Sequence, residues 1–144
     1  MNRQKGFTLI EIMVVIIILG MLAGLVLPRI LGQEEKAKIE TAKVQIRSLE
    51  SALDAYKLDN GFYPETEQGL AALIKLPETG RIPLKWREGG YLKPARIPKD
   101  PWGKDYAYLS PGSENREYEI ISYGVDGEPG GEGKNADIES WKIE

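Results

Sequence analysis

Apolar residues fill nearly every position from Phe7 to Leu27, and Glu11 is the only ionisable residue among them. An α-helix of this length is roughly 30 Å long, about the thickness of a bilayer core. The run is apolar on all faces, whereas a surface helix shows one apolar stripe. The pattern therefore predicts a membrane-embedded helix. Pro28 lacks a backbone donor and disfavours helical geometry at Leu27, which predicts a kink or local unwinding near residues 24–32.

A second helical pattern follows, with apolar residues on one face and charged residues on the others. The apolar positions recur at steps of three and four, at Ile39, Ala42, Ile46, Leu49, Leu53 and Tyr56. The pattern ends at Asp59-Asn60-Gly61, where Asn60 or Gly61 can adopt the left-handed C-cap conformation. We therefore expect one long helix over about 7–58, with its first half in lipid and its second half supporting a soluble head.

The head beyond residue 61 is rich in glycine and proline and predicts short elements. Thr66 is a candidate N-cap for a short helix that Pro77 would stop. Residues 78–105 predict an ordered loop anchored by four bulky residues, Trp86, Tyr91, Leu92 and Trp102. Residues 106–109 and 117–123 predict an antiparallel hairpin, and 138–143 a third short strand with Trp141 facing inward. The fold class is α+β, with the long helix packed on a small antiparallel sheet.

Composition removes whole classes of function. The 144 residues carry a formal net charge of −3, which gives no indication of nucleic-acid binding. The chain has no cysteine and no histidine, so disulfide frameworks, Cys–His dyads and Ser–His–Asp triads are excluded. No carboxylate has an identifiable nucleophile or base as its partner. We therefore do not expect an enzyme.

The N-terminus resembles a targeting signal in its charge pattern. Arg3 and Lys5 precede the apolar run, so this end should stay in the cytoplasm and the head should be exported. The small-x-small cleavage motif of secretory signal peptides does not follow the run. The segment is then either an uncleaved anchor or one that is cut on the other side of the apolar run.

Glu11 is the anomaly in the apolar segment, because a carboxylate in lipid is costly unless it is paired or near the membrane boundary. One interpretation places it at the interface, where it reaches water. The other requires a cation at the same depth. Cleavage after Gly6 would create one, the α-amino group of Phe7, four residues away. Within one chain this pair spans a helical turn, and between chains it would fix an axial offset.

A loop rich in glycine and acidic residues closes the chain at positions 126–137. Calcium takes six to eight oxygen ligands, and glycines let a loop turn its carbonyls inward. Asp126 and Asp137 bracket the loop, but the spacing does not match an EF-hand. On the residues alone, a solvated acidic loop is favoured over a calcium site.

Gly6-Phe7-Thr8-Leu9-Ile10-Glu11 resembles the N-terminal signature of type IV pilins and pseudopilins. The resemblance implies that a prepilin peptidase cuts after Gly6 and methylates Phe7. It also implies that Glu11 contacts the N-terminus of a neighbouring subunit, and that Pro28 is the family's helix-breaking proline. The expected segments are a leader at 1–6, a transmembrane and filament-core helix at 7–31, and a periplasmic head at 32–144.

The head is similar to the major pseudopilins of the type II secretion system. The similarity lies in Tyr56–Pro64, Thr66–Leu70, Gly90-Tyr91-Leu92, Asp100-Pro101-Trp102-Gly103 and Ala136-Asp137-Ile138. In that family the C-terminal loop binds calcium, so the resemblance favours a calcium site over a solvated loop. The implied ligands are the side chains of Asp126 and Asp137, carbonyls near Tyr123 and Glu128, and the Ser140 side chain. The loop around Gly80–Leu84 is longer than in common members.

The resemblance implies a structural subunit of a periplasmic pseudopilus that drives protein export through the outer membrane. The expected partners are other copies in a helical homopolymer, minor pseudopilins, the prepilin peptidase, and an inner-membrane platform with its ATPase. Before assembly the chain would span the inner membrane once. Two alternatives stay open: a type IV or competence pilus subunit, and a membrane-tethered calcium-binding module that never polymerises.

Overall fold

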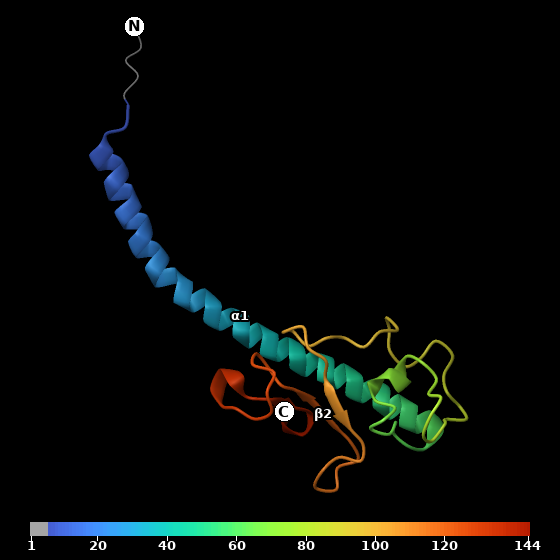
Figure 1. The fold of residues 1–144 in the computed structure, drawn as a ribbon. Helices are drawn as coiled ribbons and strands as arrows, with labels where there is room; N and C mark the ends of the chain where they lie inside the picture. The colour runs from blue at the N-terminus through green and yellow to red at the C-terminus, as the bar shows by residue number, and fades with distance from the viewer. Residues whose placement is uncertain (1–5) are drawn as a thin grey trace. The chain divides into compact units, whose positions relative to one another are not determined.

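The computed structural model describes residues 6–144, and for residues 26–31 it describes the backbone but not the side chains. One long helix, α1 (Leu9–Asn60), precedes a head of short elements (Figure 1). The chain divides between residues 37 and 38 into two compact units.

The first unit holds the N-terminal part of α1. Every large apolar side chain described between Phe7 and Leu25 is at least 47% exposed, so this apolar surface is uncovered in the single chain. Among the described residues, no helical segment is both long and apolar enough to cross a membrane. α1 continues through Pro28 without a break, so of the two alternatives predicted there, local unwinding is wrong and a kink stays a prediction. Proline costs a helix one N–H donor, and the long helical runs on both sides maintain the geometry.

The second unit begins inside α1 and confirms the predicted stripe. Ala42, Ile46, Leu49, Leu53 and Tyr56 are fully buried, and Ile39 packs against their cluster. The helix ends at Asn60, two residues beyond the prediction, and Gly61 has a φ of 83° with its N–H bonded to the Lys57 carbonyl. The predicted left-handed cap is therefore confirmed at Gly61.

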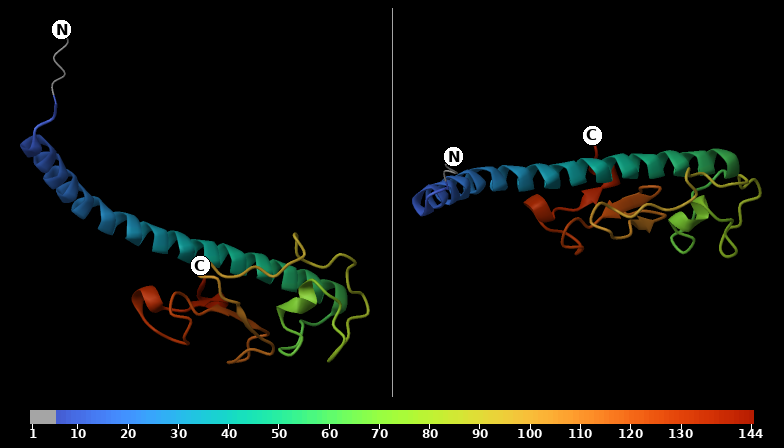
Figure 2. Two further views of the ribbon diagram at one scale, coloured as in Figure 1. Left: turned by 45° about the horizontal axis from the view of Figure 1, so that its top comes forward. Right: turned by 90° about the horizontal axis from the view of Figure 1, so that it is seen from above.

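The sheet has three short antiparallel strands in the order β1 (Ala107–Leu109), β2 (Glu119–Ser122) and β3 (Ile138–Glu139). Tyr108 lies opposite Ile120, and Ser122 lies opposite Ile138. Figures 1 and 2 show the strands along one side of the head part of α1. The predicted hairpin and third strand are confirmed, although each strand is shorter than expected.

The remaining elements correct the prediction in detail. The short helix is a 3-10 turn, η1 (Leu70–Leu73), and it follows Gly69 rather than a Thr66 cap. The Thr66 hydroxyl instead accepts a hydrogen bond from Ser110 N at 2.8 Å, so it ties the start of the head to the hairpin. Two further 3-10 turns are η2 (Gly133–Asn135) and η3 (Ser140–Lys142).

The long loop at residues 78–105 is ordered as predicted. Leu92 is buried, and Trp86, Tyr91 and Trp102 pack against the core. The Trp86 indole also donates to the Ala72 carbonyl at 2.9 Å. Trp141 differs from the prediction, because it lies outside the core cluster with the Arg116 guanidinium 4.3 Å from its ring centroid.

Candidate functional site

The N-terminal motif forms a capping box at the start of α1. The Thr8 hydroxyl accepts a hydrogen bond from Glu11 N at 3.2 Å, and the Glu11 carboxylate accepts one from Thr8 N at 3.4 Å. This reciprocal pair satisfies two of the free N–H groups at a helix start. It explains why the helix begins at Leu9 rather than at Phe7. The Thr-x-x-Glu spacing is a sequence signature of such a box, which an interpretation based on the charge of Glu11 alone misses.

The expected processing position lies just outside the helix. Gly6 and Phe7 precede α1, and the Phe7 side chain is 80% exposed. Both are therefore in exposed, non-helical chain. Pro28 lies inside α1 among residues whose side chains are not described, so its role in assembly stays a prediction.

The C-terminal loop leaves one carboxylate oxygen without a partner. Gly130 N donates to Oδ2 of Asp137 at 2.8 Å, whereas Oδ1 of Asp137 is buried and has no hydrogen-bond partner among the described residues. A buried carboxylate oxygen without a donor is costly, so a bound cation would stabilise it. The donor chemistry fits calcium, which binds oxygen ligands.

Two other expected ligands, Tyr123 and Asp126, lie at the N-terminal end of this loop. Asp126 is exposed, and its Oδ1 accepts a hydrogen bond from Glu128 N at 3.2 Å. The Tyr123 carbonyl accepts one from Gly127 N at 3.1 Å. No group of three or more acidic side chains suitable for a metal occurs among the described residues, so backbone carbonyls would have to complete the shell.

Lys104 fixes the first part of this loop. Its ammonium donates to the carbonyls of Val125 at 3.1 Å and Gly124 at 3.4 Å. A Cβ placed on Gly127, whose φ is +72°, would lie 2.2 Å from the Lys104 nitrogen. Asp100, itself buried, accepts a hydrogen bond from Lys104 N at 2.8 Å. Lys104 is not among the residues predicted from the sequence, because no local pattern links it to a loop twenty residues later.

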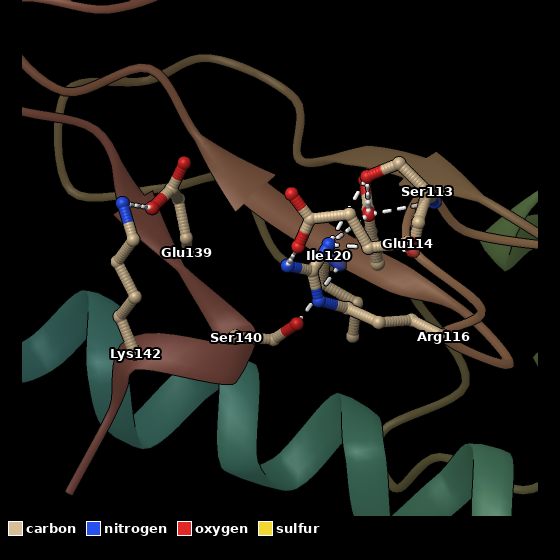
Figure 3. Close-up of polar contacts among 8 residues, drawn as sticks. Ser113, Glu114, Arg116, Ile120, Glu139, Ser140 and Lys142 are labelled. Atoms are coloured by element: carbon tan, nitrogen blue, oxygen red, sulfur yellow. Dashed lines mark hydrogen bonds and ion pairs between the residues drawn. The ribbon is translucent and has the colours of Figure 1, made fainter.

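Ser140, another expected ligand, makes a hydrogen bond to the sheet. Its hydroxyl oxygen accepts a hydrogen bond from Ile120 N at 3.2 Å, beside the β1–β2 hairpin (Figure 3). That oxygen therefore joins η3 to β2, and because a hydroxyl oxygen has a second lone pair, its role as a calcium ligand stays a prediction.

The same region contains a buried ion pair. Glu119 is 3% exposed, and Arg116 donates to its carboxylate at 2.9 Å. The backbone N–H of Ser113 donates at 2.8 Å, and the Ser113 hydroxyl also donates. These bonds, above all those from Ser113, lower the pKa of Glu119 despite its burial. The cluster closes the hairpin and lies apart in sequence from the acidic loop.

Comparison with known proteins gives two family matches that together cover most of the chain. Residues 29–141 match the family model described as type II secretion system (T2SS), protein G. Residues 1–27 match the prokaryotic N-terminal methylation motif.

Curated relatives agree with these models over their full length. The chain is 54% identical to the type II secretion system core protein G of Vibrio cholerae, covering all of this chain and 96% of the relative. It is 49% identical to the Pseudomonas aeruginosa protein of the same name, covering 97% and 96%.

A solved structure agrees as well. The crystal structure of the major pseudopilin from the type 2 secretion system of enterohaemorrhagic Escherichia coli is 42% identical, with a TM-score of 0.68. The match covers 78% of this chain and 94% of that one. The expected architecture, a long N-terminal helix packed on a small antiparallel sheet, is thereby confirmed. This chain belongs to the type II secretion system protein G family.

Proposed function

We propose that this chain is the structural subunit of a type II secretion pseudopilus. The single observation that carries the proposal is the uncovered apolar surface of α1 before residue 26, next to a folded head with its own core. Such a surface requires lipid or other apolar helices around it. Copies that bundle through it, displaced along the filament, form an open polymer. The matched protein G family favours this over the two alternatives left open by the sequence.

The methylation motif supports the processing step of the proposal. A prepilin peptidase would cut after Gly6, and the N-terminus of Phe7 would be methylated. Before assembly the apolar segment would anchor the chain once in the inner membrane, with the head in the periplasm. A platform with its ATPase, and minor pseudopilins, would be the partners in assembly. The chain would have no catalysis of its own.

Calcium binding by the C-terminal loop belongs to the same proposal. Its support is the buried, partnerless Oδ1 of Asp137 together with the oxygen-rich loop that begins at Asp126. Carbonyls near Tyr123 and Glu128 would supply further oxygens. The ion would supply positive charge that stabilises the loop, whereas Lys104 supplies it only to the carbonyls of residues 124 and 125.

The capping box allows a sharp test of Glu11. Glu11→Gln keeps a side chain that can complete the box but removes the charge that would pair with the N-terminus of Phe7. In a strain lacking its own protein G, we expect the wild-type chain to restore secretion and give filaments by immunogold electron microscopy. We expect Glu11→Gln to give neither, with N-methylation of Phe7 followed by mass spectrometry.

Thr8→Ala is the matched control, because it removes the hydroxyl of the box and keeps the charge of Glu11. Filaments with Thr8→Ala but not with Glu11→Gln would assign Glu11 a charge-dependent role in assembly. Normal filaments with Glu11→Gln would show that the charge of Glu11 is not needed for assembly and that the residue acts only as a helix cap. Absence of wild-type filaments in a secreting strain would contradict the proposed function itself.

A further inference from the structure

Leu84 is the most exposed large apolar side chain of the described head, at 97% exposure. The segment that carries it, residues 81–85 (the Leu84 loop), is held in place. Lys85 N donates to the Asn60 side chain at 3.0 Å, and the Arg81 guanidinium lies 3.9 Å from the Phe62 ring centroid. Because the backbone of this loop is already held, little backbone freedom is lost when Leu84 binds, which suits the side chain to a contact.

The Leu84 loop is positively charged at the end of α1. No carboxylate among the described residues pairs with the side chains of Arg81 or Lys85. With Asn60 and Phe62 the loop borders a cavity of about 340 Å³. The surface thus combines one protruding leucine with the ammonium group of Lys85, while the Arg81 guanidinium lies against Phe62.

The other end of the head's helix carries a partly apolar pocket. A pocket of about 240 Å³, which we call the C-terminal pocket, lies between α1 and the end of the chain, and its apolar lining is Ile39, Ala136, Ile138 and Ile143. Its charged lining is Lys43, Asp137, Glu139 and Lys142, in which the two lysines pair with Glu40 and Glu139. This volume is several times the roughly 30 Å³ that a water molecule occupies in the liquid, so a side chain can enter. Glu132 is exposed beside the pocket residue Gly133, and none of the described cations pairs with it.

The two surfaces cannot meet within one chain. Ile39 and Asn60 are separated by 21 residues of helix, which is about 30 Å at 1.5 Å per residue. Two different surfaces at opposite ends of one head make a head-to-tail contact, and such a contact extends into an open filament rather than closing a dimer. If the two surfaces bind each other, the occupant of the C-terminal pocket is therefore a second copy of this chain.

We infer that Leu84 of one copy inserts into the C-terminal pocket of the next copy, with Lys85 facing Glu132. The inference rests on the proposed function, since it supplies the contact between heads in that filament. It also assigns a role to the long Gly80–Leu84 region, to which the sequence alone assigns none.

The absence of cysteine from the natural chain permits a direct test by disulfide trapping in the full-length protein. A disulfide forms only where two Cβ atoms come within about 4.5 Å. We expect a chain carrying both Leu84→Cys and Ala136→Cys to give, after mild oxidation of cells with filaments, a ladder of covalent dimers, trimers and larger species. Chains carrying one substitution each should crosslink only when mixed, and only to dimers.

Leu109→Cys with Ala136→Cys is the matched control, because Leu109 is also exposed, at 42%, but lies in β1. It should give no ladder. Lys85→Glu or Glu132→Lys should each reduce the ladder several-fold, and the two together should restore it.

Filaments are counted by electron microscopy in the same cells, which separates the two levels of the proposal. Filaments without a Leu84–Ala136 ladder would overturn the inference and leave the function intact. Dimers formed by Leu84→Cys alone would overturn it in favour of a symmetric contact, and trapping of another protein instead would assign the loop to that partner. Loss of filaments in the cysteine-free chain would contradict the function.

Discussion

At the residue scale, Glu119 is the clearest case of a charge that stabilises the head. It is 3% exposed, yet its pKa is lowered from 4.5, because Ser113 and Arg116 donate to the carboxylate. We expect Glu119→Gln to reduce the free energy of unfolding by about 1–3 kcal/mol at pH 7, since it weakens bonds to a buried acceptor. Urea denaturation measures the loss.

The pH dependence has a definite sign. A carboxylate whose folded pKa lies below its unfolded value contributes fully above pH 4.5 and loses that contribution as pH falls through the folded pKa. The gap between wild type and Glu119→Gln should therefore shrink as the pH is lowered below 4.5. Glu117→Gln is the control, because its own side chain is 63% exposed and that of its partner Lys57 is 37% exposed. A gap that does not change with pH would show that Glu119 acts only through packing.

At the element scale, the second half of α1 provides a matched pair. Ile46 is fully buried in the core of the head, whereas Val44, two residues away on the same helix, is 68% exposed. We expect Ile46→Ala to cost about 2–5 kcal/mol through lost burial and a cavity. Val44→Ala should change stability by less than about 0.5 kcal/mol. Thermal and urea unfolding of both variants test this, and equal losses would mean that the stripe does not form the core.

The elements also show where sequence reasoning succeeds. The stripe from Ala42 to Tyr56 and the Gly61 cap were predictable, because helical periodicity and left-handed glycine are local properties. The hairpin was predictable because two strand-like segments, 106–109 and 117–123, lie close together in the sequence. Thr66 was misassigned, because its partner Ser110 lies 44 residues away and no local pattern reveals that bond. Trp141 was misplaced for the same reason, since Arg116 covers its ring on the surface.

In the candidate site, too, local properties were predictable from the sequence and long-range contacts were not. Asp137 was found from composition and resemblance, and the structure adds that one of its oxygens is buried without a partner among the described residues. Ser140 also came from the resemblance; the structure adds that its hydroxyl oxygen accepts a hydrogen bond from β2, and its role as a ligand stays a prediction. Lys104 was not predicted, because a lysine that donates to the carbonyls of residues 124 and 125 has no sequence signature. Residue types predict which kind of ligand a loop can bind, whereas long-range packing decides which contacts each residue makes.

At the scale of the whole molecule, the two units differ in how their apolar residues are buried. The head folds around its own core, whereas the apolar surface described between Phe7 and Leu25 is uncovered in a single chain. Substitutions in the first unit should therefore alter assembly without altering head stability. Contacts between copies can then come from both units, through the apolar helices and through the Leu84 loop.

Calcium connects head stability to those contacts, because Asp137 both bears the partnerless oxygen and lines the C-terminal pocket. We expect EDTA to lower the melting temperature of the full chain in detergent, and excess calcium to restore it, since a ligand that binds only the folded state stabilises it. Asp137→Asn should lower the melting temperature in calcium and abolish the response, while Glu88→Gln, an exposed acid elsewhere, should leave it intact. In filaments, EDTA should also reduce the Leu84–Ala136 crosslink. A melting temperature that does not respond to calcium would contradict calcium binding by the loop. A response without any change in crosslinking would show that calcium stabilises the head but does not affect the contact between heads.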